Sequence, residues 1–128
     1  MDYEGNAIAL WYQSTGSGVT DIVSNRYVNG SGWGTAGVID SDNAGNADAP
    51  RIAVNARGDA IAVWRQSDAT RYNIWANRYT RGFGWGGAGE IETENLGDAD
   101  DPQIVIDSGG TAVAVWQQYD GSQYNIQA

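Results

Sequence analysis

Residues 60–66 read Ala-Ile-Ala-Val-Trp-Arg-Gln, and nearly the same seven residues occur at 7–13 (AIALWYQ) and at 112–118 (AVAVWQQ). The tryptophan in the middle of the stretch recurs at spacings of 53 and 52 residues. Both sets of alternate positions are apolar over most of the stretch, which predicts a strand that is buried on both faces. Such a strand lies between two layers of protein. The recurrence makes the chain a tandem repeat, and the repeat decides the fold.

Other short segments recur at the same offset of 52 residues. They are Asn25-Arg26-Tyr27 with Asn77-Arg78-Tyr79, Gly32-Trp33-Gly34 with Gly84-Trp85-Gly86, Pro50 with Pro102, and Tyr72-Asn73-Ile74 with Tyr124-Asn125-Ile126. One length difference interrupts the pattern, because the first repeat carries an extra residue between Gln13 and Asn25. Loops tolerate such changes, so we expect a turn in that segment.

Each repeat contains four short stretches rich in β-branched and aromatic residues, separated by Gly-containing turns, and no stretch has a convincing helical period. In the second repeat the expected strands are residues 51–55, 60–66, 73–79 and 89–93. Gly58 and Gly110 stand where a turn needs a positive φ. The pattern predicts an all-β fold of four-stranded antiparallel β-propeller blades.

The whole chain, 1–128, is expected to be a single repeat domain of about two and a half blades. The predicted divisions are a partial blade at 1–49, a full blade at 50–101 and a partial blade at 102–128. Both ends of the sequence fall inside expected strands, where a cut leaves unpaired edges. We therefore expect the chain to be a fragment of a longer repeat protein.

The run from Ala60 to Trp85 resembles a kelch-type propeller repeat: an apolar strand, a turn, a strand ending in Arg78-Tyr79, and a tryptophan soon afterwards. The start of the first strand, Pro50-Arg51-Ile52, resembles the blades of bacterial β-propellers. Kelch repeats carry a Gly pair at the end of the second strand, where this chain has Trp64-Arg65-Gln66. The resemblance implies a blade layout and an interaction role, and it implies no particular ligand.

Composition narrows the possible partners. The net charge is −9, the seven cationic residues are all Arg, and the sequence has no Cys and no His. A negative field repels polyanions, so we expect neither nucleic acid nor anionic membrane as a partner. Met1 is followed by Asp2, Tyr3 and Glu4 and not by a signal-peptide pattern, so the sequence does not fix the cellular compartment. An extracellular or cell-surface location is favoured if the chain belongs to a longer exported protein.

An acidic segment follows the fourth expected strand in each of the first two repeats. Carboxylates and amides beside a Gly turn are the ligands that Ca²⁺ prefers, although the spacing is not that of an EF-hand. The alternative is that these residues make and cap a turn between blades, and no other cofactor is expected. The candidate metal ligands are Asp40, Asp42, Asn43 and Asp48, and then Glu92, Glu94, Asn95 and Asp100.

Aromatic residues beside amides suggest a sugar site. Sugars stack on aromatic planes, but recurring aromatics also pack cores, and burial is expected for Trp11, Trp64 and Trp116. The candidate ligand-binding residues are Trp75, Tyr72, Asn73, Tyr124 and Asn125.

Three functions remain open at this point. The first is a non-catalytic interaction module, the second a lectin-like carbohydrate-binding propeller, and the third a glycosidase fragment using a carboxylate pair. The sequence nominates no catalytic residue, so we expect no enzyme. Bare blade faces predict a homo-oligomer, with a dimer favoured, and leave a protein or a glycan as a further partner.

Overall fold

The computed structural model describes residues 1–16, 18–41, 44–94 and 96–128. These residues form three antiparallel sheets and no helix, which confirms the predicted all-β class. The described part of the chain holds no helix long and apolar enough to cross a membrane. Its sheets do not close into a barrel, so the propeller remains a hypothesis.

Each sheet follows the chain as a meander. The first sheet contains β1 (Ala7–Ser14), β2 (Thr20–Val28), β3 (Gly32–Trp33) and β4 (Gly37–Val38). The middle sheet contains β5 (Ala47–Val54), β6 (Ala60–Ser67), β7 (Tyr72–Thr80), β8 (Gly84–Trp85) and β9 (Gly89–Glu90). The third sheet contains β10 (Ala99–Ile106), β11 (Ala112–Tyr119) and β12 (Tyr124–Gln127).

The structure confirms the predicted turns and differs from the predicted bounds of the first and fourth strands. The extra residue of the first repeat lies in the β1–β2 turn, and Gly58 and Gly110 have φ values of 91° and 93°, as expected. The fourth strand is instead two short pieces, β8 and β9, that pair with β7 one after the other. The first strand begins before Pro50, because a bulge with Ala49 at φ 50° takes the proline into the strand.

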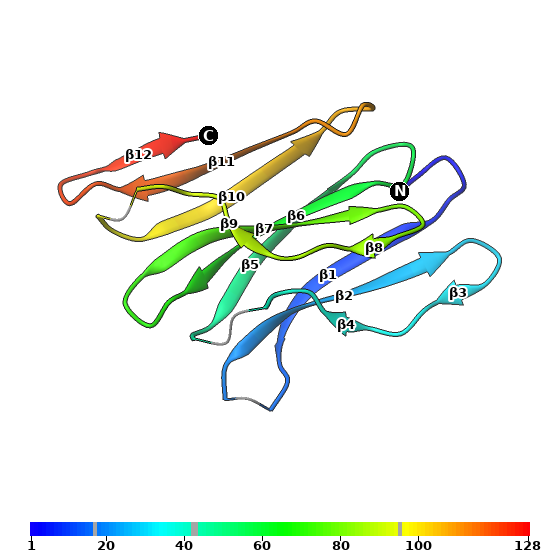
Figure 1. Cartoon of the computed structure of the whole chain (residues 1–128), viewed down its shortest axis with the longest axis horizontal. Helices are drawn as coiled ribbons and strands as arrows, with labels where there is room; N and C mark the ends of the chain where they lie inside the picture. Colours follow the sequence, from blue (N-terminus) through cyan, green and yellow to red (C-terminus); the bar gives the residue numbers. More distant parts are fainter. Residues whose placement is uncertain (17, 42–43, 95) are drawn as a thin grey trace.

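The three sheets stack side by side, with the middle sheet between the other two (Figure 1). β5 packs against β1 and β2, and β10 packs against β5, β6 and β7. The cores of the two contacts are built from equivalent residues, 52 apart: Ile22, Ala47 and Trp64 in one, and Ile74, Ala99 and Trp116 in the other. The repeat in the sequence is therefore a repeat of the inter-sheet contact.

The middle strand β6 is buried on both faces, as its sequence predicts. Trp64 and Ala62 are fully buried toward the first sheet, and Val63 is fully buried on the opposite side. The Trp64 indole donates a hydrogen bond of 2.8 Å to Gln66 Oε1, so its one polar atom keeps a partner in the core. Trp116 bonds Gln118 in the same way, at 3.1 Å.

A hydrogen bond from a main-chain amide to a side chain of the next linker accompanies each inter-sheet contact. The Asn46 side chain accepts a hydrogen bond of 3.0 Å from the Thr20 amide, and Asp98 accepts one of 2.9 Å from the Tyr72 amide. Gly45 and Gly97, which precede these two acceptor residues, approach the following hairpin closely. A Cβ on Gly97 would lie 2.7 Å from the Tyr119 ring. These segments are therefore structural spacers between sheets.

Candidate functional site

Most carboxylates gather at one end of the stack, which we call the acid end. It contains the turns after β1, β6 and β11, the linkers that precede β5 and β10, and the first residues of those two strands. Two cations, Arg65 and Arg71, lie at this end. Its described carboxylates are Asp21, Asp40, Asp48, Asp68, Glu92, Glu94, Asp98, Asp100, Asp101 and Asp120.

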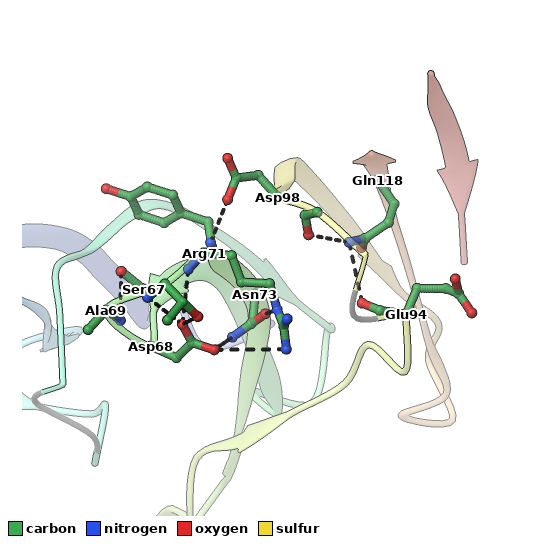
Figure 2. Close-up of polar contacts among 11 residues, drawn as sticks. Ser67, Asp68, Ala69, Arg71, Asn73, Glu94, Asp98 and Gln118 are labelled. Atoms are coloured by element: carbon green, nitrogen blue, oxygen red, sulfur yellow. Dashed lines mark hydrogen bonds and ion pairs between the residues drawn. The ribbon is translucent and has the colours of Figure 1, made fainter. Parts of the chain in front are cut away.

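The turn after β6 is built around Asp68 (Figure 2). Its Oδ1 accepts hydrogen bonds from the Thr70 amide at 2.8 Å, the Thr70 hydroxyl at 2.5 Å and the Arg71 amide at 3.0 Å. These bonds, the one from the Thr70 hydroxyl first, hold the pKa of Asp68 well below its ordinary range. Asn73, a predicted sugar ligand, is buried beneath the turn and donates to Asp68 Oδ2 at 3.3 Å.

The turn after β11 repeats this arrangement. Asp120 accepts from the Ser122 hydroxyl at 2.7 Å and from the Gln123 amide at 2.9 Å, and its pKa is lowered for the same reason. Asn125, another predicted sugar ligand, donates to Asp120 Oδ2 at 2.7 Å. Both asparagine amides therefore donate hydrogen bonds that hold turns.

The predicted aromatic ligands differ in accessibility. The Arg65 guanidinium lies 4.4 Å from the centre of the Tyr72 ring and covers one of its faces. Trp75 is half-buried and packs against the core that contains Trp64. Tyr124, the equivalent of Tyr72 in the third sheet, is 59% exposed, and its ring lies 5.3 Å from that of Tyr119. Tyr124 is thus the most accessible of these three predicted aromatics.

An arginine joins two of the predicted metal ligands. Arg65 Nε and Nη2 donate to the two oxygens of Asp48, and Arg65 Nη1 donates to Asp100 Oδ1 at 3.0 Å. The hydrogen bond from Arg65 to Asp48 and the two nearby charges raise the pKa of the guanidinium. Arg65 thus forms ion pairs with carboxylates of two sheets, Asp48 on β5 and Asp100 on β10. Sequence reasoning missed this role, although Arg65 is a lone cation on an otherwise apolar strand face.

Glu92 is the unusual carboxylate of the acid end. Its side chain is 6% exposed, and neither oxygen has a partner with good hydrogen-bond geometry among the described residues. Burial, reinforced by the charge of Glu90, raises its pKa from 4.5 to about 7. It lines a cavity of about 210 Å³ together with Glu94 and Gln118.

The described residues contain no group of three or more acidic, His or Cys side chains placed to hold a metal ion. Asp40 is half-buried in the linker before β5, and Glu94 is exposed in the linker before β10. Asp42, Asn43 and Asn95 lie outside the described residues. The Ca²⁺ site therefore stays a prediction.

The outer face of the third sheet, which we call the open face, is apolar. Its residues are Val105, Val113, Val115 and Ile126, with exposures of 65%, 54%, 37% and 77%. The equivalents of Val115 and Ile126 in the middle sheet, Val63 and Ile74, are fully buried against the third sheet. Contiguous exposed apolar residues commonly mark an interaction site.

Comparisons with known proteins give no relative from which a role could be transferred. No family is matched. Neither a curated protein nor a solved structure matches the chain.

Proposed function

We propose that this chain is a non-catalytic interaction module built from β-propeller-type blades, and that it associates through the open face of its third sheet. The observation that carries the proposal is the contrast in burial between equivalent positions. Ile22 and Ile74 are fully buried by the sheet that follows them, whereas Ile126 is 77% exposed. The same surface that joins sheets inside the molecule is left bare at one end of the stack.

A second copy of the chain carries a matching surface on its first sheet. In the internal contact with the first sheet, Trp64 and Trp85 of the middle sheet pack against the core that contains Ile22. Their equivalents in the first sheet are Trp11, which is half-buried, and Trp33, which is 57% exposed. A head-to-tail contact would place these tryptophans over the open face of another copy.

Polar groups at the acid end support a non-catalytic role. Asp48, Asp68, Asp100 and Asp120 are held by internal hydrogen bonds or ion pairs, which fix turns and sheets. A glycosidase requires two carboxyl groups that face each other across a substrate. Hydrolysis of chromogenic glycosides by the purified chain, lost in Glu92→Gln, would overturn this part of the proposal.

Analytical ultracentrifugation tests the association. At about 0.15 M salt, where repulsion between chains of net charge −9 is screened, the wild type should self-associate reversibly. Ile126→Asp blocks the open face and Trp33→Glu blocks the opposite surface, so each variant alone should be monomeric. Mixed in equal amounts they should form one heterodimer, because each supplies the surface that the other lacks.

The matched control is Phe83→Asp, which adds the same charge at a 91% exposed apolar residue in the β7–β8 turn. It should associate like the wild type. A wild type that is still monomeric at about 1 mM would refute the proposal. Self-association of Trp33→Glu alone would refute the head-to-tail arrangement, because it would mean that two open faces pair with each other.

A lectin-like role is the second candidate, and the exposure of Tyr124 favours it. The Tyr124 side chain is 59% exposed at the edge of the acid end, and its ring lies next to that of Tyr119. A glycan array should then show binding that Tyr124→Ala abolishes. Tyr72→Ala should leave this binding intact, because the Tyr72 ring is covered by Arg65. Absence of binding to any glycan at high protein concentration would remove this candidate.

A further inference from the structure

The strand β1 has the sequence of a central strand but occupies the edge of its sheet. In the middle sheet β6 pairs with β5 on one side and β7 on the other, and in the third sheet β11 pairs with β10 and β12. Their equivalent β1 pairs only with β2 among the described strands. A long edge with apolar residues such as Ile8 and Leu10 is a surface on which another strand can add.

The two complete pairs show which strand fits this edge. β5 reads Ala-Asp-Ala-Pro-Arg-Ile-Ala-Val and β10 reads Ala-Asp-Asp-Pro-Gln-Ile-Val-Ile. Each pairs antiparallel with its neighbour and has a bulge at the same place, between the acidic residue and the residue after proline. The shared pattern is Ala-Asp-x-Pro-x-Ile-x-aliphatic.

The register is also the same in both pairs. Ile52 lies opposite Ala62, and Val54 lies opposite Ala60. In the third sheet, Ile104 lies opposite Ala114, and Ile106 opposite Ala112. A small alanine thus faces a branched aliphatic residue at two successive inward positions. β1 offers the same alanines, Ala7 and Ala9, and no strand of the described residues lies opposite them on that side.

We propose that the free edge of β1 is a binding site for an extended peptide segment of the Ala-Asp-x-Pro-x-Ile-x-aliphatic pattern. The segment adds antiparallel to β1, with its isoleucine opposite Ala9 and its last aliphatic residue opposite Ala7. Main-chain hydrogen bonds supply the affinity, and the alanine positions supply the selectivity for this pattern. The site is the edge of the first sheet and contains no residue of the open face, although it adjoins Trp11 of the first-sheet surface proposed for association.

Burial on binding adds to the backbone pairing. In the middle sheet, β5 contributes Ala47 to the core that contains Trp64, and Trp64 is fully buried. The equivalent tryptophan of β1, Trp11, is only half-buried. The added segment would place its first alanine opposite Gln13, as Ala47 lies opposite Gln66, next to this tryptophan.

A synthetic peptide with the sequence of residues 46–55, NADAPRIAVN and blocked at both ends, tests the site directly. Its single Asp and single Arg make it neutral, so it is not repelled by the acidic chain. Titration calorimetry should give a dissociation constant in the micromolar range, about tenfold or more tighter than that of a scrambled peptide. Hydrogen exchange should show new protection confined to the amides of Ala7–Ser14.

Two variants separate this site from the open face. Ala9→Asp places a charge opposite the isoleucine of the peptide and should weaken binding about tenfold or more, with an unchanged circular dichroism spectrum. Ile126→Asp, which alters only the open face, should bind the peptide like the wild type. No binding at about 1 mM peptide, equal binding of the scrambled sequence, or protection that falls on the third sheet would overturn the proposal.

Discussion

Replacing Trp64 by alanine should be among the most destabilising single changes in this chain. The side chain is fully buried in the contact between the first and middle sheets, and it packs with Ile22, Ile39, Ala47 and Ala62. Truncation of a buried Trp costs about 3–5 kcal/mol, from lost transfer free energy and from the cavity left behind. The change also removes the indole donor from Gln66 Oε1, which is buried with it, so we expect the upper half of that range.

The repeat supplies two internal references for this prediction. Trp116 makes the same hydrogen bond to Gln118 but is 7% exposed and belongs to a smaller core cluster, so Trp116→Ala should cost about 2–4 kcal/mol. Trp11 is half-buried, and Trp11→Ala should cost least, about 1–2 kcal/mol. The free energy of unfolding should therefore fall in the order Trp11→Ala, Trp116→Ala, Trp64→Ala.

Urea unfolding followed by far-ultraviolet circular dichroism measures these differences. A small domain has only about 5–15 kcal/mol of stability, so Trp64→Phe serves as a milder variant if the alanine protein is unfolded at the outset. Phe keeps most of the volume but loses the indole donor. If Trp64→Ala and Trp11→Ala differed by less than about 0.5 kcal/mol, the stacked arrangement of sheets would be refuted.

Three further predictions concern the acid end. Burial raises the pKa of Glu92 from 4.5 to about 7, so the protein should lose stability as the pH rises from about 4.5 to 7. Glu92→Gln should flatten this part of the pH–stability curve, and an unchanged curve would contradict the burial of that carboxyl. Hydrogen bonds lower the pKa of Asp68, so its contribution to the free energy of unfolding should be lost as the pH falls below 3.8. If the turn is as described, acid unfolding of Asp68→Ala should lack this loss of stability. Gly97→Ala brings a Cβ to 2.7 Å from the Tyr119 ring and should lower the midpoint of thermal unfolding by several degrees. The control Gly87→Ala, whose Cβ would have no atom within 4 Å, should leave the midpoint unchanged. Equal effects of the two variants would argue against the close approach at Gly97.

The sequence predicted the strands well where the pattern is local. The stretch from Ala60 to Gln66 is apolar on both faces, and the structure buries both faces of β6 because sheets lie on either side of it. The expected burial of Trp64 and Trp116 is confirmed by their exposures of 0% and 7%. The expected burial of Trp11 is wrong, because no sheet covers its side and it is only half-buried in the described structure. The reason is that a recurring apolar pattern specifies a recurring environment.

Contacts between residues that are distant in the sequence could not be predicted from local sequence patterns. Arg65 bridges Asp48 and Asp100, which are 17 and 35 residues away in sequence, and no local pattern reports such an encounter. The bulge at Ala49 places a non-glycine residue at φ 50°, a backbone conformation that single-residue preferences argue against. Asn73 is a predicted sugar ligand by residue type alone, and its hydrogen bond to Asp68, five residues away across the turn, is not visible in that residue type.

Strand-resolved hydrogen exchange in dilute solution tests the central claim, that three sheets stack by one repeated contact and leave the third sheet open. Amides of β6 should exchange slowest, because sheets cover both of its faces, and amides of β11 should exchange faster, because Val113 and Val115 face solvent. Protection of β11 equal to that of β6 would contradict the account, since it would mean that the open face is covered within the single chain.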